Sequence, residues 1–504
     1  MNEDNRKEIR ISVRNLVEFV LRSGDIDNRR SASAQKDAML AGGRIHRKIQ
    51  KRMGSGYRAE VPLKHEVRDE EQEITLLVEG RADGIFAENG IPVIDEIKGM
   101  YTDISRLEEP IEVHLAQAMC YGYFYCCDKD LDGIRLQMTY CNLETEEIKR
   151  FQTDRSREEL ETWFSGVVHE YFKWARYLYH HELIRDASIG HLEFPFPYRA
   201  GQRDLVVSVY RTVSRKKRLF IQAPTGIGKT LSTVFPAVRA IGEGKGDKLF
   251  YLTAKTVTRT VAEEAFRILR DHGLIFTSVT ITAKEKLCPM DECECNPDAC
   301  PYAKGHFDRV NEAVFDILHL EQEMTREKIL QYAEKYRVCP FEYCLDISSW
   351  TDGIICDYNY VFDPNVRLKR YFADGQKGDY LFLVDEAHNL VSRAREMYSA
   401  ELKKEDLQIT ELIHRFVREH VEAGDICIDA TAGCGNDTLF LCELTGARGE
   451  VMAFDIQPQA LEKTATLLAE HECMAELVLD SHSNMADYMS EGSAACIMFN
   501  FGYL

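Results

Sequence analysis

Short apolar runs that end beside glycine-rich or acidic turns recur along this chain and predict an α/β protein of several domains. A parallel sheet carries the polar residues that follow its strands to one carboxyl edge, where ligands bind. The candidate chemistry is therefore expected where these runs end. The predicted strands are Ile74–Val78, Ile91–Ile94, Leu219–Gln222, Tyr380–Val384, Ile426–Asp429 and Val451–Phe454.

A longer amphipathic stretch, Ser156–Leu183, predicts a helix between the N-terminal runs and the central ones. It is rich in aromatic residues, and we expect these to pack the N-terminal domain rather than to stack on nucleic-acid bases. The aromatic residues are Trp163, Phe164, Tyr171, Phe172, Trp174 and Tyr177.

The octapeptide Ala223–Thr230 has the spacing of a phosphate-binding loop between a predicted strand and a predicted helix. Gly226 and Gly228 allow backbone N–H groups to wrap phosphates, and the N-terminus of the following helix adds its dipole. Lys229 would reach the β- and γ-phosphates, while the Thr230 hydroxyl would hold Mg²⁺. We therefore predict an ATP site.

The apolar run Tyr380–Val384 is followed by an acidic box. Asp385 would bind Mg²⁺, and Glu386 would orient and deprotonate the attacking water. His388 would relay between the ATP site and a nucleic-acid track. A strand, a phosphate loop and an acidic box in this order predict nucleotide hydrolysis.

With these motifs, residues 195–405 resemble the DinG/XPD family of superfamily 2 DNA helicases. Phe196–Arg203 looks like the family's adenine-reading segment, with Gln202 on the base. Tyr251–Thr256 looks like a motif that contacts the DNA backbone, and Asp357–Phe362 resembles the stretch ahead of the acidic box. The resemblance implies a RecA-like parallel sheet and ATP-dependent action on single-stranded or forked DNA in repair.

Six of the 16 cysteines fall between Cys288 and Cys344. The charged start of the chain shows no signal peptide, so we expect a cytoplasmic protein, where clustered cysteines favour metal over disulfides. The helicase resemblance implies a [4Fe–4S] cluster in a helical insertion at about 284–345. The cysteines that we assign to it are Cys288, Cys295, Cys300 and Cys339.

Alternatives to this cysteine assignment remain open. Cys293 could take the place of Cys295, and Cys344 is expected to be a bystander. A tetrahedral zinc site has the same four-thiolate chemistry as an iron–sulfur cluster, so the sequence does not separate them. Ordinary buried thiols are the third possibility.

Three short motifs follow one another in the N-terminal 190 residues: Gly43–His46, Gly80–Asp83 and Asp95–Lys98. In an Asp…Glu-x-Lys arrangement the two carboxylates share a divalent metal. The alternation of a strand places Lys98 on the same face as Glu96, beside the attacking water.

These motifs, together with Gln117 and Tyr121 on one helix face, resemble the PD-(D/E)xK nucleases of the RecB type. The resemblance implies that His46, Asp83 and Glu96 hold Mg²⁺ or Mn²⁺ for DNA cleavage. The alternative is a degenerate domain that only grips DNA.

Near the C-terminus, a strand ending at Asp429 is followed by Gly433 and Gly435, a helix near Thr438 and a second strand that ends before Asp455. This is a Rossmann arrangement, in which the glycines admit a ligand and the carboxylate binds ribose hydroxyls. NAD is one ligand for such a site.

The leading acid and two later segments instead resemble the YtqB-type RNA methylases, which use S-adenosylmethionine and act on tRNA. These segments are Asp480–His482 and Phe499–Leu504. The resemblance implies Asp455 on the ribose, Asp480 near the adenine and Asn500 near the reacting atoms. It predicts a partial methyltransferase sheet and RNA as a partner.

We expect three domains: a nuclease-like domain at 1–190, one RecA-like lobe at 191–407 and a partial methyltransferase at 408–504. Residues 401–504 carry 6 basic and 19 acidic residues, hence −13 of the net charge of −20. No motif of a second RecA-like lobe follows Glu386, so we expect ATP binding without unwinding by this chain alone. We expect the join at 400–415 to be a chimera of the gene model or assembly, or a recombination product. No transmembrane run is present.

Overall fold

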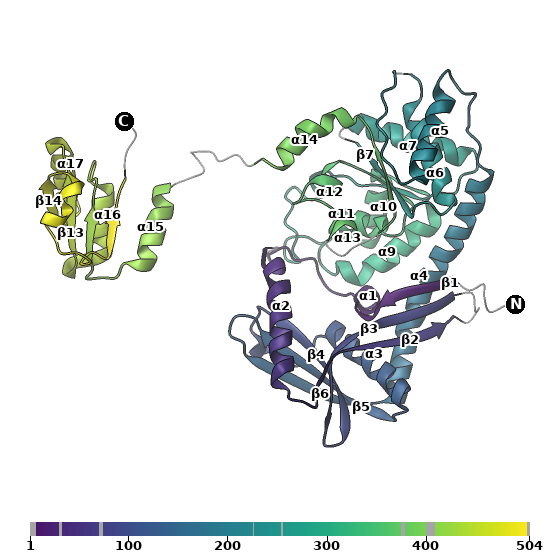
Figure 1. Cartoon of the computed structure of the whole chain (residues 1–504), viewed down its shortest axis with the longest axis horizontal. Coiled ribbons are helices and arrows are strands. Elements are labelled where there is room, and N and C mark those ends of the chain that lie inside the picture. The colour runs from purple at the N-terminus through teal and green to yellow at the C-terminus, as the bar shows by residue number, and fades with distance from the viewer. Residues whose placement is uncertain are drawn as a thin grey trace. The chain divides into compact units, whose positions relative to one another are not determined.

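The computed structural model describes residues 7–29, 33–69, 74–224, 226–253, 256–373, 378–399 and 409–500. The chain forms two compact units, Met1–Tyr398 and Ser399–Leu504, coloured from purple to green and from green to yellow in Figure 1. The predicted boundary at 190/191 falls inside the first unit, at the end of its longest helix.

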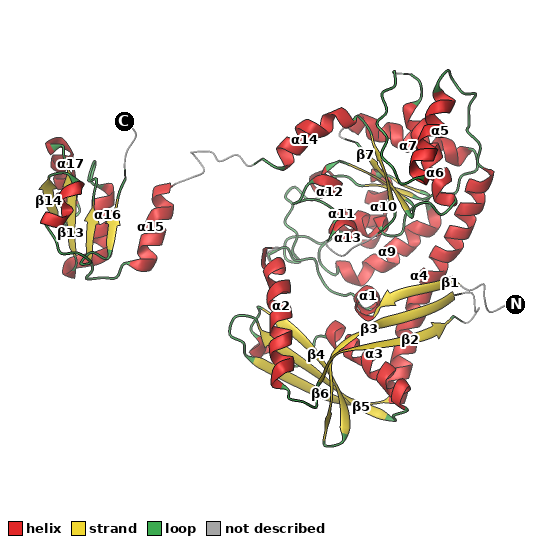
Figure 2. Ribbon diagram, in the orientation of Figure 1, coloured by secondary structure: helices red, strands yellow, loops and turns green. Residues whose placement is uncertain are grey.

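The N-terminal part of the first unit is a six-stranded mixed sheet in the order β1-β3-β4-β5-β6, with β2 paired to β3 (Figure 2). Both predicted strand runs form, but β3 and β4 continue through the acidic motifs, so Asp83 and Glu96 lie within strands rather than after them. The elements are β1 (Lys7–Ser12), α1 (Val13–Val20), α2 (Ser33–Arg52), β2 (Arg58–Arg68), β3 (Ile74–Glu88), β4 (Ile91–Met100), η2 (Ile104–Arg106), α3 (Glu112–Lys129), β5 (Gly133–Asn142) and β6 (Ile148–Ser156).

Helix α4 (Arg157–His191) joins the two parts of the first unit. It begins at a capping box, in which the Ser156 hydroxyl accepts from the Glu159 N–H and the Glu159 carboxylate accepts from the Ser156 N–H. The helix is longer than predicted, and its aromatic residues are shared between two cores. Phe164 packs in the N-terminal core, whereas the Trp174 ring lies 4.5 Å from that of Trp350. The expectation that all of them pack the N-terminal domain was therefore wrong.

The second part of this unit is a five-stranded parallel sheet in the order β11-β7-β10-β8-β9. Its parallel strands need crossover connections, which its helices supply. The elements are α5 (Gln202–Ser214), α6 (Lys229–Gly242), β7 (Lys248–Leu252), α7 (Thr256–Asp271), β8 (Ser278–Thr280), α8 (Lys284–Leu287), α9 (His306–Leu320), β9 (Glu323–Met324), α10 (Arg326–Tyr336), α11 (Pro340–Ser348), β10 (Gly353–Cys356), α12 (Asn359–Phe362), α13 (Lys369–Phe372), β11 (Tyr380–Val384), η3 (Ala387–Asn389) and α14 (Leu390–Met397).

The predicted strand Leu219–Gln222 does not form. Its residues join none of the described strands, and Phe220 is 89% exposed. An apolar run becomes a strand only where a neighbour completes the hydrogen-bond ladder. Strand β11, which pairs with β7 alone, is an edge strand of the described sheet, with Phe382 exposed.

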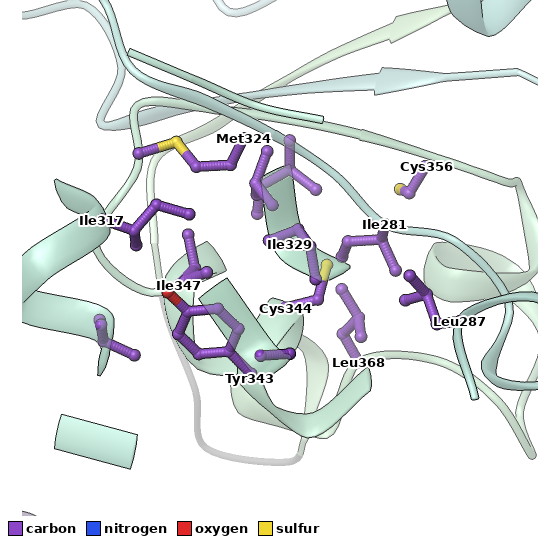
Figure 3. Close-up of a cluster of buried hydrophobic side chains, with 14 of the residues drawn as sticks. Ile281, Leu287, Ile317, Met324, Ile329, Tyr343, Cys344, Ile347, Cys356 and Leu368 are labelled. Carbon is purple, nitrogen blue, oxygen red and sulfur yellow. The ribbon is translucent and has the colours of Figure 1, made fainter. Parts of the chain in front are cut away.

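The segment between β8 and β10 is mainly helical, as predicted for residues 284–345. Its helices close a buried core against the sheet, in which Ile281, Leu287, Tyr343 and Cys344 lie together (Figure 3). Burial of this apolar surface fixes the segment to the sheet.

The second unit has four parallel strands in the order β14-β13-β12-β15. The predicted strands and the helix near Thr438 are confirmed. The elements are α15 (Ile409–His420), β12 (Ile426–Asp429), α16 (Asn436–Thr445), η4 (Gly446–Arg448), β13 (Glu450–Asp455), α17 (Pro458–Glu470), β14 (Glu476–Leu479), η5 (His482–Asp487) and β15 (Cys496–Met498). Among the described helices of the chain, none has the length and apolarity needed to span a membrane.

Candidate functional site

The phosphate-loop candidate has the backbone that its glycines predict. Gly226 and Gly228 adopt left-handed conformations, with φ of +84° and +76°, and α6 begins at Lys229, slightly earlier than expected. A Cβ atom at Gly228 would lie 3.0 Å from the Gln202 Nε2 atom. Because bulk is excluded there, the loop presents its N–H groups at the start of α6.

Gln202 lies under this loop. Its Oε1 accepts from the Arg199 N–H at 3.0 Å, and its Nε2 donates to the Ser232 hydroxyl at 3.1 Å. The side chain is buried, so in this arrangement its amide supports the loop and α6. The structure therefore places Gln202 beside the loop with its amide already engaged.

The acidic box meets the phosphate loop at the end of β11. Lys229 Nζ lies 3.9 Å from Glu386 Oε1, and the His388 ring lies 3.3 Å from the other carboxylate oxygen. Burial and the neighbouring Glu386 raise the pKa of Asp385. Two neighbouring carboxylates repel each other when both are ionised, so such a pair is suited to binding a cation.

Two tyrosines that the sequence did not reveal hold this arrangement. The Tyr251 hydroxyl bonds the side chains of both Thr230 and Asp385. The Tyr358 hydroxyl donates to the backbone carbonyl of Glu386 at 3.2 Å. Both tyrosines lie in stretches that the sequence predicted to be helicase motifs, and this was the signal available for finding them. Within the first of those stretches, Ala254 and Lys255 lie outside the described residues, as does Thr225 of the loop.

The four assigned cysteines line one enclosed pocket, together with Lys284. Lys284 hydrogen bonds to Cys295, and the Cys339 sulfur accepts from the first N–H groups of α11. Burial raises the pKa of Cys339 to about 11, so the free thiol stays protonated without a cation. The pocket joins Cys288, Cys295, Cys300 and Cys339.

The structure separates the two remaining cysteines from this pocket. Cys293 is exposed and does not line it, although its sulfur hydrogen bonds with Cys288. Cys344 is buried in the apolar core of Figure 3, with its sulfur 3.7 Å from the Thr280 carbonyl oxygen. Of the two cysteines that were alternatives for one ligand position, Cys295 rather than Cys293 lines the pocket.

The structure brings side chains of the three N-terminal motifs near one another. The His46 Nδ1 atom on α2 lies 3.3 Å from Asp83 Oδ1 on β3. On β4, Lys98 Nζ donates to Glu96 Oε1 at 2.8 Å and to Gln117 Oε1 at 2.7 Å. These residues come from four elements, α2, β3, β4 and α3.

Glu96 is buried, and its second oxygen, Oε2, has no hydrogen-bond partner. Burial, opposed by Lys98 and reinforced by Asp83, raises the pKa of Glu96 to about 7. By contrast, both carboxylate oxygens of Asp95 accept hydrogen bonds, one from Tyr57 and the other from Gln137 and Thr139. We therefore assign Asp95 a structural role. An unpaired carboxylate oxygen beside Asp83 and His46 is an arrangement that a divalent cation completes.

No described group of three or more His, Cys, Asp or Glu side chains is gathered closely enough in this structure to hold a single metal ion. At the N-terminal site, ligation by His46, Asp83 and Glu96 therefore requires their side chains to move together. Side-chain rotamers rearrange more readily than the strands that carry them.

In the second unit, the Gly433 N–H donates to Asp455 Oδ2 at 3.0 Å, which links the glycine turn to the end of β13. The buried Asp429 carboxylate accepts from the Thr438 hydroxyl at 2.6 Å. Gly435 has φ of +85°, and a Cβ there would lie 2.9 Å from Thr464 Cα. The predicted ligand residues therefore converge on one end of the parallel sheet.

The other two predicted residues have local partners. Asp480 accepts a hydrogen bond from the Tyr488 hydroxyl at 2.9 Å. The hydrogen bonds that this carboxylate accepts lower its pKa, and the bond from the Ser481 N–H contributes most. Asn500 donates to Asp437 at 2.9 Å, and Asp437 also contacts His414, two residues that the sequence did not single out. Residues 501–504 of the predicted C-terminal motif lie outside the described ranges.

Comparisons with known proteins match two separate segments of the chain. Residues 275–407 match the DEAD_2 family model, and residues 451–504 match the rRNA_methylase family model. The methylase and helicase parts of the sequence analysis are thus confirmed at this coarser level.

Three relatives illustrate the division. A chloroplastic tRNA (mnm(5)s(2)U34)-methyltransferase from Arabidopsis thaliana is 37% identical over 107 residues, which cover 19% of this chain and 39% of the relative. A regulator of telomere elongation helicase 1 homolog from Caenorhabditis briggsae is 24% identical over 326 residues, 55% of this chain and 32% of the relative. An rRNA methylase structure from Streptococcus thermophilus is 38% identical, covers 18% of this chain and 48% of that chain, and has a TM-score of 0.16. The chain thus spans well under half the length of either curated relative.

The raised pKa of Glu96 predicts a pH dependence of stability without added metal. Its folded-state value of about 7 exceeds the ordinary 4.5, so the folded protein holds a proton that the unfolded chain loses. The free energy of unfolding should therefore fall as pH rises from 4.5 to about 7. Urea titrations across this range should show a smaller fall for Glu96→Gln than for the wild type. An identical fall in both proteins would contradict the assignment.

Proposed function

We propose that the first unit is an ATP-dependent DNA helicase-family motor with an associated nuclease domain. It contains most of the segment that matches the DEAD_2 model. The observation that carries the proposal is the meeting of Lys229 and Glu386, 3.9 Å apart, with Thr230 and Asp385 joined through Tyr251. These four groups supply a phosphate clamp, two Mg²⁺ ligands and a water-orienting carboxylate.

Each of these residues has a distinct task in the proposed hydrolysis. The N–H groups at the start of α6 bind phosphate oxygens, and Lys229 offsets their negative charge. Glu386 accepts a proton from the attacking water, and its left-handed backbone at φ of +48° directs the carboxylate toward Lys229. Thr230 and Asp385 would hold Mg²⁺, which neutralises charge on the phosphates.

A basic groove supports DNA as the partner. It lies between α8 and α13, beside the cysteine pocket, and has seven basic side chains against three acidic ones. Despite the net charge of −20, this local excess suits a phosphate backbone. The basic residues are Arg259, Lys284, Lys286, Arg367, Lys369, Arg370 and Arg393.

Replacement of Lys229 tests the ATP site. In Lys229→Ala, we expect the affinity for a fluorescent ATP analogue to fall on the order of 100-fold, because a charge-assisted phosphate contact is lost. Lys173→Ala removes an exposed lysine that pairs with Glu170, and serves as the matched control. Equal nucleotide affinity in Lys229→Ala and the wild type would rule out this site.

We further propose that the cysteine pocket holds a [4Fe–4S] cluster. The four cysteines line one pocket, so their thiolates can be brought to one metal centre. Tetrahedral zinc uses the same four thiolates, and elemental analysis separates it from the cluster. A cluster binds each thiolate through a different iron and therefore suits ligands spread around a pocket.

Two neighbouring cysteines give a sharp test of this assignment. Cys295→Ser should yield colourless protein with little iron or acid-labile sulfide, because Cys295 lines the pocket. Cys293→Ser is the matched control and should remain brown, since Cys293 is exposed. Zinc in place of iron, measured by elemental analysis of anaerobically purified wild type, would refute the cluster.

For the N-terminal domain we propose metal-dependent cleavage of DNA. Lys98 lies between Glu96 and Gln117, so it can hold an attacking water next to the carboxylates. The unpaired Glu96 Oε2 supports ligation of Mg²⁺ or Mn²⁺ by Glu96, Asp83 and His46. A bound cation would lower the pKa of its water, and Lys98 would stabilise the hydroxide that forms.

Single-stranded DNA cleavage in Mn²⁺ measures this activity. In Lys98→Ala we expect a loss of at least about 100-fold, typical for a group that contacts the attacking water. Lys48→Ala, which removes a half-exposed lysine paired with Glu146, should leave cleavage unchanged. Absence of cleavage in the wild type would favour a domain that only binds DNA.

The second candidate function, a tRNA or rRNA methyltransferase, belongs to the second unit. The link from the Gly433 N–H to Asp455 favours it, since it assembles a nucleoside site at the end of parallel strands. Asp455 would bind the ribose hydroxyls of S-adenosylmethionine, and Asn500 would lie near the reacting atoms. Because this segment is strongly acidic, a contact with RNA requires a local basic patch.

Calorimetry with S-adenosylmethionine tests the second unit. Asp455→Ala should weaken binding about 10- to 100-fold, the cost of losing a bidentate hydrogen bond to the ribose. The exposed Asp487 provides a control, because Asp487→Ala removes the same charge from a residue outside the predicted ligand set. Tighter binding of NAD than of S-adenosylmethionine would overturn the methyltransferase proposal.

A further inference from the structure

The segment Arg22–Arg29 connects α1 with the chain leading to α2 and lies against the cysteine-bearing loop (Figure 1). We call it the strap. Its backbone contacts alternate, as in an extended chain: the Ile26 N–H donates to the Ala303 carbonyl at 3.0 Å, and the Asn28 N–H donates to the Cys295 carbonyl at 2.9 Å. The strap is therefore bonded directly to a pocket cysteine.

Further contacts fix the loop around the third cysteine. The Phe307 N–H donates to the Gly24 carbonyl at 3.0 Å, and the Gly305 N–H donates to the Asp25 carboxylate at 2.6 Å. The Arg29 guanidinium bonds Asp298, which lies between Cys295 and Cys300.

The other end of the strap is held by the helix that follows the fourth cysteine. Arg22 Nη1 donates to Asp346 Oδ2 on α11 at 2.8 Å, and Arg22 Nε donates to Asn311 Oδ1 on α9 at 2.7 Å. Both charged side chains of the Arg22–Asp346 pair are only 17% exposed, so water screens them weakly. The strap is thus anchored at both ends.

Ile26 lines the cysteine pocket, and the other lining residues all come from positions 284–341. We propose that the strap seals this pocket, so that the N-terminal domain controls the access of water, oxidants and alkylating agents to the four cysteines. The apolar shell around a thiolate site governs solvent access. The effect on an iron–sulfur cluster rests on the proposed function, whereas the shielding of the thiols does not.

The seal is tested on the whole 504-residue chain, as purified, by measuring the rate at which a maleimide labels Cys295 and Cys300, resolved by peptide mass mapping. Ile26→Ala should accelerate labelling on the order of tenfold, because labelling reports local opening. Leu183→Ala is the matched control, since it shortens a 53%-exposed side chain on α4, away from the pocket. Brown preparations should also bleach faster in air when Ile26 is replaced.

Asp25→Ala provides a second variant that leaves the pocket lining intact and removes only the bond to Gly305. Thermal melting identifies a variant that has unfolded as a whole. Labelling and bleaching at wild-type rates in both folded variants would overturn the seal. A colourless, iron-free wild type would instead overturn the cluster, while the labelling rates would still decide whether the strap shields the cysteines.

Discussion

The buried carboxylate of Asp352 unites the first unit. It sits just before β10, where it accepts from the Thr277 N–H and hydroxyl and contacts His181 and Arg185 of α4. Burial alone would raise its pKa, yet the bond to His181 and the charge of Arg185 hold the pKa at about 2. Because breaking a buried ion pair leaves an uncompensated charge, these contacts hold α4 against the sheet. The N-terminal acidic site, the cysteine pocket and the ATP site belong to one compact unit.

A comparison of buried and half-buried carboxylates separates structural from reactive ones. The Asp352 carboxylate accepts hydrogen bonds from charged and neutral donors, and its pKa is lowered. Glu96 and Asp385 instead have raised pKa values, and Glu96 keeps an oxygen without a partner. Carboxylates held in this costly state are suited to binding cations or protons. Asp95 shows that a raised pKa is insufficient by itself, because its hydrogen bonds are complete.

Much of the fold was predictable because its signals are local. The glycines of the phosphate loop, the run before Asp385 and the glycine turn after Asp429 each specify their own backbone. Leu219–Gln222 shows the limit of such reasoning. Its apolar composition predicts a strand, but a strand also needs a neighbour to complete its hydrogen bonds, and none of the described strands pairs with it. The aromatic residues of α4 likewise indicated burial without indicating which core would receive them.

The amino-acid sequence shows which chemical groups this protein has: a phosphate loop, an acidic box, a cysteine set, an Asp…Glu-x-Lys series and a glycine turn. Which of these groups meet depends on the folded arrangement of the chain. It placed Cys295 rather than Cys293 in the pocket, brought Tyr251 between Thr230 and Asp385, and laid Ile26 against the cysteines. The reason is physical. Backbone conformation follows from neighbouring residues, whereas contacts between distant segments follow from the packing of whole helices and sheets.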